Sequence, residues 1–313
     1  MTVLVIDKPI GPTSFTVVRQ VRRALARAWG KAPRELKVGH GGTLDPMASG
    51  VLPICVGEAT KLAPFLLEAD KEYEATLRFG VETDTLDAEG RVVATAEVGA
   101  LSAAAIEAAL DRFRGAISQV PPMYSALKRD GRPLHSYARA GEEVERAPRQ
   151  VRVHALTLTA FEPPDAARLH VRCSKGTYVR VLAADLGRAL GPGAHLTALR
   201  RTASGPFHAS AALPLDEVLR RLEVGQSLPF VSLSDALAHL PGIEVPEIVA
   251  NALRRGQRVA WQDLPGAPAA GSIRVLEAGL GLVAVVEPGE GGTVRTQRVF
   301  NRPASTVANV TGA

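Results

Sequence analysis

The segment VGHGGTLDPMASGVLPICVG, residues 38–57, combines a cluster of glycines, an Asp-Pro pair and an apolar run. This order predicts a Gly-rich loop, a short turn of helix and a strand. Because Pro favours the first helical position, Asp45 can be an ordinary helix N-cap in front of Pro46. Alternatively, the glycines beside it let the backbone and a ligand approach closely, and the Asp45 carboxylate is then presented to that ligand.

The residues before this segment predict a strand followed by a basic helix. Val3 to Ile6 form a short apolar run, and the turn KPIGPTS comes next, in which Ser14 can cap the helix that follows. Four arginines share one face of that helix: Arg19, Arg22, Arg23 and Arg27. This face is either a solvated surface or a contact for phosphates, and the sequence leaves both interpretations open.

Beyond residue 57 the pattern alternates between strands and helices. KEYEATLRFG places Tyr73, Ala75, Leu77 and Phe79 on one face, which predicts a half-exposed strand. VRVHALTLTAF and ARLHVRCS alternate in the same way and suggest paired antiparallel strands. Ser102 can cap a further helix, and Thr177 can cap one that runs to Leu190.

Two regions depart from this alternation. Residues 119–150 are basic and rich in turn formers, which predicts a long loop or insertion. A candidate boundary lies at residues 240–246, LPGIEVP, and a small, mostly β module follows it. We therefore predict one domain over residues 1–240 and a second over residues 245–313.

Composition narrows the class of protein. The 313 residues carry a formal net charge of +5, which fits a nucleic-acid partner without requiring one. Two cysteines, Cys55 and Cys173, lie in apolar runs and are expected to be small buried hydrophobes. No long apolar stretch or signal-peptide pattern is present, so we expect a cytoplasmic protein without a membrane span. The absence of P-loop, zinc-type and GxGxxG motifs predicts no metal and no cofactor.

Five ordered segments resemble those of TruB-type tRNA pseudouridine-55 synthases. GTLDPMASGVLPICVGEATKL looks like the catalytic motif of this family. The other four are DKPIGPTS, KEYEATLRFGVETDT, QVPPMYSALKRDGRPLHSYARAG, and CSKGTYVRVLAADLG with GAHLTALRRT. The C-terminal module resembles, more weakly, a PUA-type RNA-binding domain. The resemblance covers nearly the whole chain and implies an α+β fold, in which a mixed, mostly antiparallel sheet forms the catalytic domain beside a small β-rich domain.

The resemblance also implies roles for individual residues. Asp45 matches the nucleophilic aspartate, Tyr73 the tyrosine that stacks on the target base and is implicated in proton removal, and Arg180 the arginine that pairs with the catalytic carboxylate. Such a pair keeps an aspartate ionised by lowering its pKa. The plainer interpretations are an aromatic on the buried face of a strand for Tyr73 and a surface helix charge for Arg180.

Further residues match those that surround the target nucleotide. Tyr178 and Leu199 match residues that line the uridine pocket, although Leu199 can also be plain core packing. His40 matches a histidine beside the flipped-out nucleotide, or is a loop histidine without a role. Lys175 is either a phosphate contact or part of a solvated turn.

The implied activity is the isomerisation of uridine 55 in the tRNA T-loop to pseudouridine. It requires no redox change and no group loss, which agrees with the missing cofactor motifs. The expected partner is the tRNA T-arm, with no membrane and no protein partner, and we expect a monomer. Two alternatives stay open: a non-catalytic RNA-binding or RNA-folding protein on the same scaffold, and a dyskerin-like enzyme directed by guide RNA and partner proteins.

Overall fold

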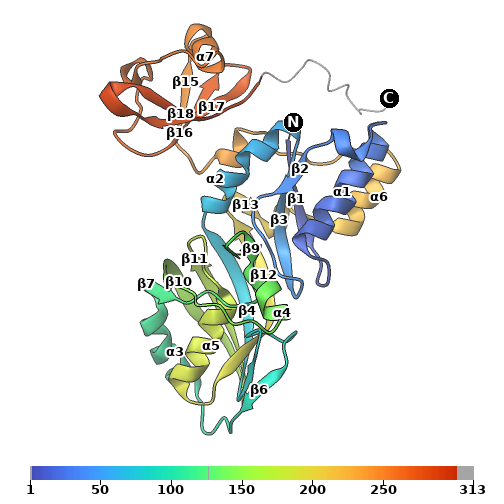
Figure 1. Ribbon diagram of the computed structural model, residues 1–313, viewed down its shortest axis with the longest axis vertical. Helices are drawn as coiled ribbons and strands as arrows, with labels where there is room; N and C mark the ends of the chain where they lie inside the picture. Colours follow the sequence, from blue (N-terminus) through green and yellow to red (C-terminus); the bar gives the residue numbers. More distant parts are fainter. Residues whose placement is uncertain (1, 126, 302–313) are drawn as a thin grey trace. The chain divides into compact units, whose positions relative to one another are not determined.

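A computed structural model describes residues 2–125 and 127–301 of the chain (Figure 1). They form an α+β fold with a large mixed sheet and a separate small β-rich region near the C-terminus, which confirms the predicted fold class. The described residues divide into two compact units. The first unit comprises residues 2–45, 50–69 and 204–301, and the second comprises residues 46–49 and 70–203.

The first unit is built on short strands at the N-terminus. β1 pairs in parallel with β14 and in antiparallel register with β3, and β2 pairs in antiparallel register with the C-terminal end of β3. Helix α1 packs beside α6 (Figure 1). The elements are β1 (Thr2–Lys8), α1 (Ser14–Ala28), β2 (Val38–His40), β3 (Ala48–Val56), α2 (Ala63–Glu68), β13 (Phe207–His208), β14 (Leu213–Pro214) and α6 (Leu215–Glu223).

The start of helix α1 differs from the expectation. Thr13 is its N-cap, because the Thr13 Oγ1 accepts a hydrogen bond of 3.1 Å from the Thr16 backbone N–H. The prediction that Ser14 caps this helix is wrong, since Ser14 is the first helical residue and its buried hydroxyl bonds a distant segment. Along the helix Val17, Val21 and Leu25 are buried, whereas the predicted arginine face is exposed or half-buried.

The C-terminal part of the first unit has its own sheet. Its strand order is β15-β16-β17-β18, in which only the first pair is parallel. The elements are β15 (Gly242–Val245), α7 (Glu247–Arg254), β16 (Ile273–Glu277), β17 (Gly281–Pro288) and β18 (Val294–Val299). Residues 302–313 of the predicted second domain lie outside the described residues, and the predicted boundary between residues 240 and 245 stays a prediction.

One face of this C-terminal sheet contributes to the N-terminal core. Leu282, Val285 and Phe300 are buried in one cluster with Val3, Leu66 and their neighbours. The Lys61 ammonium donates a hydrogen bond of 3.1 Å to the Val299 carbonyl at the same place. The module is therefore part of the apolar core of the first unit as well as a small sheet of its own.

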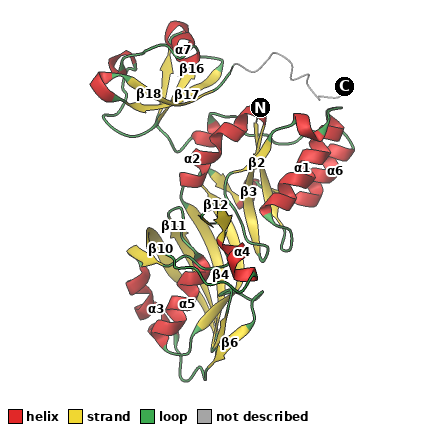
Figure 2. Ribbon diagram, in the orientation of Figure 1, coloured by secondary structure: helices red, strands yellow, loops and turns green. Residues whose placement is uncertain are grey.

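The second unit is an antiparallel sheet covered by helices. β4 pairs with β11, β11 with β10, and β10 with β7, and β12 lies next to β4. Helices α3 and α5 pack together against these strands (Figure 2). The elements are β4 (Lys71–Phe79), β5 (Val81–Thr83), β6 (Val92–Thr95), α3 (Ala103–Leu110), β7 (Gly115–Gln119), β10 (Arg149–Glu162), β11 (Ala166–Cys173), α5 (Val179–Leu190) and β12 (Ala194–Ser204).

Sequence patterns predicted most of this second unit. The alternation of β4 is confirmed, because Tyr73, Ala75, Leu77 and Phe79 are all buried. Ser102 caps α3 as expected, with its hydroxyl accepting from the Ala105 N–H at 3.2 Å. The predicted Thr177 cap is wrong, since α5 follows Tyr178 and the Thr177 hydroxyl instead donates to the Ser174 carbonyl.

The predicted insertion over residues 119–150 contains regular structure. A small hairpin joins β8 (Lys128–Arg129) to β9 (Arg132–Pro133), and helix α4 (Leu134–Arg139) follows. The hairpin turns at Asp130-Gly131, where both residues have positive φ values, 51° and 78°. Asp-Gly is the favoured pair for such a two-residue turn, so a sequence signal for this hairpin was present.

The two cysteines are buried, as predicted, and lie in β3 and β11. Burial raises the pKa of Cys55 to about 12 and that of Cys173 to about 11. Both thiols are therefore protonated near neutral pH, and they act as small apolar side chains. No helix within residues 2–125 and 127–301 is long and apolar enough to cross a membrane.

Candidate active site

The loop that leads to Asp45 lies close to helix α2, and Gly41 permits this close approach. Gly41 follows β2, and its N–H donates to the Pro53 carbonyl of β3 at 2.9 Å. A Cβ atom at Gly41 would lie 2.8 Å from the Leu66 Cδ1 of α2, which is closer than such atoms approach. A side chain at this position would therefore push the loop away from α2, and the glycine is required by the close approach.

A second restraint lies directly before Asp45. The Ser14 Oγ accepts a hydrogen bond from the Leu44 N–H at 2.8 Å and donates one to the Leu44 carbonyl at 3.0 Å. Both Ser14 and Leu44 are buried, so these bonds are shielded from competition with water. The hydroxyl holds the peptide groups on both sides of Leu44, and this holds the backbone that presents Asp45.

The half-buried Asp45 does not begin a helix. Pro46 and Met47 form a turn, and strand β3 starts at Ala48. The predicted turn of helix is wrong, and so is the interpretation of Asp45 as its N-cap. Pro46 serves the turn because its fixed φ suits this conformation as well as a helix start.

His40 lies at the end of β2, opposite Ile54 of β3, and is half-buried. Its Nδ1 accepts a hydrogen bond of 3.3 Å from the Gly42 N–H. The bond turns the ring toward the loop that leads to Asp45.

Tyr73 belongs to the second unit. It lies on β4 opposite Val171 of β11, with 9% of its surface exposed. The strand supplies a rigid support, because β4 is hydrogen-bonded along its whole length to β11. Most of the ring is buried, as on any apolar strand face, and the remaining exposure leaves one part of the side chain accessible.

Arg180 is the second residue of helix α5 and is buried, with 6% exposure. Its interpretation as a surface helix charge is therefore wrong. Its Nη1 lies 3.3 Å from the Asp87 Oδ2, and its Nη2 donates to the Tyr124 carbonyl at 2.6 Å. A cation in the first turn of a helix is disfavoured by the helix dipole, so the Asp87 carboxylate offsets an unfavourable position as well as a buried charge.

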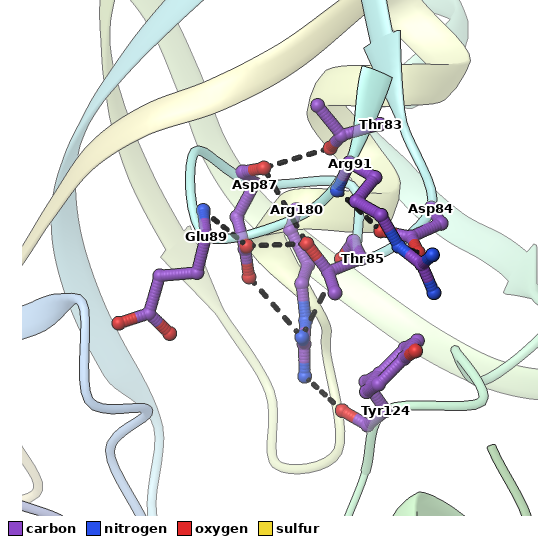
Figure 3. A network of polar contacts seen from close by, with 8 residues as sticks. All are labelled: Thr83, Asp84, Thr85, Asp87, Glu89, Arg91, Tyr124 and Arg180. Carbon is purple, nitrogen blue, oxygen red and sulfur yellow. Dashed lines mark hydrogen bonds and ion pairs between the residues drawn. The ribbon is translucent and has the colours of Figure 1, made fainter. Parts of the chain in front are cut away.

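Asp87 is the centre of this network (Figure 3). Its Oδ1 accepts from the Thr85 hydroxyl at 2.6 Å and from the Glu89 N–H at 3.1 Å, while Oδ2 faces Arg180. Its backbone carbonyl accepts from the Thr83 hydroxyl at 2.7 Å. With only 2% exposure, the carboxylate is a buried charge that is both paired and hydrogen-bonded.

Sequence reasoning missed Asp87, because ETDTLDAEG is typical of an ordinary polar turn. Four acids occupy this stretch, and one of them, Asp84, pairs with the exposed Arg91. No local sequence feature distinguishes Asp84 from Asp87. Asp87 becomes a buried ion-pair partner only through Arg180, which is 93 residues away in the sequence. The one available signal was the density of Thr and Asp residues, which favours side chain to backbone bonds.

The other predicted site residues also lie in the second unit. Tyr178 is the half-buried residue directly before α5, and its ring centroid lies 5.9 Å from the Arg180 guanidinium carbon. Lys175 is exposed in the turn after β11, and Leu199 is half-buried on β12. Asp45 and His40 are residues of the first unit, so the predicted Asp45–Arg180 pair stays a prediction.

Among the described residues no group of three or more His, Cys, Asp or Glu side chains is arranged to hold a metal ion. Arg180 and Asp87 are instead engaged with each other and with backbone groups.

Comparison with models of protein families identifies the family to which this chain belongs. Residues 30–179 match the N-terminal domain of TruB family pseudouridylate synthases, and residues 180–235 match the tRNA pseudouridylate synthase B C-terminal domain. The chain belongs to the TruB family. As a TruB-family protein it is a pseudouridine synthase, an isomerase, which confirms the resemblance seen in the sequence.

Curated relatives agree with this assignment. A tRNA pseudouridine synthase B of Aromatoleum aromaticum is 51% identical over 280 residues, covering 88% of this chain and 85% of that protein. One of Burkholderia mallei is 46% identical over 292 residues, covering 92% and 93%. The TruB relationship thus extends beyond the two matched domains, into the C-terminal module after residue 235.

Solved structures show the same fold. A Cbf5-Nop10-Gar1 complex matches with a TM-score of 0.72 at 26% identity, over 96% of this chain and 85% of that one. An H/ACA RNP bound to a substrate RNA containing 2'-deoxyuridine matches with a TM-score of 0.71 at 25% identity, with the same coverage. The TruB-family chain therefore shares its pseudouridine synthase fold with proteins found in RNA-protein complexes.

Proposed function

We propose that this chain converts uridine 55 in the T-loop of tRNA to pseudouridine, with Asp45 as the nucleophile. Family membership and relatives named tRNA pseudouridine synthase B support tRNA as the substrate class. The observation that carries the role of Asp45 is its loop. A half-buried carboxylate that begins no helix follows a residue whose N–H and carbonyl are both bonded by Ser14.

The reaction suits the residues present. The N–C1′ glycosidic bond breaks, the base rotates, and a C5–C1′ bond forms, while C5 loses a proton and N1 gains one. A carboxylate can divide this change into easier steps by forming a covalent bond. Asp45 adds to C6 of the base, adds to C1′ of the ribose, or supports elimination to a glycal, and each route balances without an oxidant or a reductant.

The target uridine must first leave the folded tRNA. Enzymes that act on a base extrude it into a pocket and stack it on aromatic side chains. We assign this stacking to Tyr73, the lining of the pocket to Tyr178 and Leu199, and the space beside the nucleotide to His40. Arg180 is the charge partner of Asp45, and Asp87 holds its guanidinium. Lys175 and the basic insertion over residues 119–150 contact phosphates of the T-arm.

The test of this proposal is to map pseudouridine at single-nucleotide resolution in tRNA incubated with the purified chain. We expect a single modified position, uridine 55, in full-length tRNA and also in an isolated T-arm stem-loop, without any protein partner. Reactivity only in the presence of a guide RNA and partner proteins would contradict the proposal, as would modification at another site.

Replacement of Tyr73 by Phe separates the two roles assigned to this residue. The ring face remains, so the affinity for the T-arm should stay within about twofold, whereas turnover should fall by about 10² to 10⁴ if the hydroxyl moves a proton. Tyr73→Leu should in addition weaken binding, because the stacking surface is lost. Single-turnover rates and RNA affinities measure the two effects, and normal turnover in Tyr73→Phe would restrict the residue to packing.

The C-terminal module should contribute phosphate contacts. Truncation is an unsuitable test, because Leu282, Val285 and Phe300 belong to the core of the first unit. We instead expect that replacing the exposed Arg255, Arg258 and Arg298 by Gln leaves the maximal rate nearly unchanged and weakens tRNA binding.

The salt dependence of affinity is the measurement. The slope of log affinity against log salt should fall by roughly 0.7 to 0.9 for each phosphate contact that is lost. Arg220→Gln on helix α6 is the control, since its partner Glu217 keeps a second arginine, Arg221. Equal slopes for the triple variant and the control would show that the module does not contact RNA.

A further inference from the structure

The side chain of Gln119 bonds both backbone groups of Tyr178. Its Oε1 accepts from the Tyr178 N–H at 3.0 Å, and its Nε2 donates to the Tyr178 carbonyl at 3.3 Å. Gln119 is the last residue of β7, and with 3% exposure it is buried. An amide makes this pair of hydrogen bonds because it carries a donor and an acceptor side by side, which among the side chains that are uncharged at neutral pH only Asn also provides.

These two hydrogen bonds lie at the start of helix α5. Tyr178 is the N-cap residue, but its own side chain makes no capping bond. Its carbonyl accepts the first helical hydrogen bond, from the Leu182 N–H at 3.1 Å, and shares that acceptor with Gln119. Gln119 therefore fixes the peptide groups from which the Tyr178 ring and, two residues later, the Arg180 side chain project.

The same segment holds Arg180 at a second point. The Tyr124 carbonyl, five residues after Gln119, accepts the 2.6 Å hydrogen bond of the Arg180 Nη2. Pro121 and Pro122 lie between the two contacts and restrict the backbone there, because each proline fixes its φ and limits the residue before it. The segment from 119 to 124 therefore makes hydrogen bonds both to the backbone of Tyr178 and to the guanidinium of Arg180.

We propose that Gln119 is a positioning residue for pseudouridine formation, which sets the orientation of Tyr178 and Arg180 by holding the first turn of α5. The proposal rests on the roles assigned above to Tyr178 and Arg180. Gln119 itself touches no reacting atom. A small rotation of this turn moves the long Arg180 side chain off Asp87, and a misplacement of about 1 Å in a catalytic constellation costs about 10²-fold in rate.

The decisive variant is Gln119→Glu, assayed as a function of pH. A neutral carboxylic acid still accepts from the Tyr178 N–H and donates its O–H to the carbonyl, whereas the carboxylate faces that carbonyl with negative charge. The rate relative to wild type should therefore be highest at low pH and fall as pH rises through the pKa of the introduced carboxyl. We expect about 10²-fold loss of kcat at pH 8 and at least about tenfold recovery toward pH 5.5, with KM within about twofold.

Two further variants exclude a simple structural effect. Gln119→Met removes both bonds and should lower kcat by a factor that does not change with pH. Ser118→Glu places a carboxylate on the exposed neighbour in the same strand and should behave as wild type. If Gln119→Met does not fold, the ratio of Gln119→Glu rates at the two pH values still tests the proposal within one protein.

A double-mutant cycle with Asp87 locates the effect. If Gln119 acts by orienting Arg180, Gln119→Met should cost much less in an Asp87→Asn background than in the wild type, because the orientation is already lost. Additive losses, a wild-type kcat, or a Gln119→Glu ratio that does not change with pH would overturn the proposal. Failure of the proposed function is distinguishable, since the wild-type chain itself would then form no pseudouridine at uridine 55, whereas the outcomes above are measured against an active wild type.

Discussion

Asp45→Asn reduces turnover by at least about 10³-fold, because loss of a nucleophile leaves only the contribution of binding and electrostatics. Asn has nearly the same size as Asp, and the neighbouring Leu44 stays bonded to Ser14 on both sides. The loop should therefore keep its conformation. Single-turnover measurement of pseudouridine in a T-arm stem-loop gives the rate, and a filter-binding titration gives the affinity.

Folding and binding provide the necessary comparison. The free energy of unfolding should change by no more than about 0.5 kcal/mol, as for a substitution without loss of core contacts. Asp216→Asn on helix α6 is the control for the Asp to Asn change at an exposed position, and it should retain full activity. A rate for Asp45→Asn near that of wild type would exclude the nucleophilic mechanism.

Asp87→Asn should lower both stability and activity. It removes the carboxylate that lies 3.3 Å from the buried Arg180 guanidinium, and removal of one partner from a buried ion pair costs about 3–5 kcal/mol. The side chains of Arg180 and Asp87 are only 7% and 4% exposed, so water cannot replace the lost charge. We also expect kcat to fall by about 10²-fold as the guanidinium shifts. Denaturant unfolding and single-turnover assays measure the two effects.

Asp84→Asn is the matched control in the same turn (Figure 3). Asp84 pairs with Arg91 at 3.8 Å, but the Arg91 side chain is 91% exposed, so this pair contributes about 0–1 kcal/mol. Arg180→Met in the Asp87→Asn background should restore part of the lost stability by removing a buried charge that has lost its Asp87 partner, while activity stays low. Equal stability of the Asp84 and Asp87 variants would contradict the proposed role of the buried pair.

Local patterns were sufficient for the family and for most strands, whereas Asp45 as the nucleophile stays a prediction from the family resemblance. Alternation over KEYEATLRFG predicted the buried face of β4, because side-chain direction in a strand follows from position alone. The ordered motifs identified the TruB family, since each keeps its residues within one short segment. Helix caps were predicted less well: Ser102 was correct, whereas Ser14 and Thr177 were not. Thr13 and Ser14 are adjacent polar residues, and so are Thr177 and Tyr178. The geometry of the preceding turn decides which residue of each pair takes the cap position of the helix.

Tertiary structure decided which distant groups meet. Ser14 bonds Leu44 across 30 residues, Gln119 bonds Tyr178 across 59, and Arg180 pairs with Asp87 across 93. Periodicity relates only residues within a few positions of one another, so it carries no information about such pairs. Nothing in the sequence around Ser14, Gln119 or Asp87 names its distant partner. In the folded chain Ser14 supports the residue before Asp45, Gln119 supports Tyr178, and Asp87 supports Arg180. These pairs form because a polar group removed from water must find its partner inside the protein.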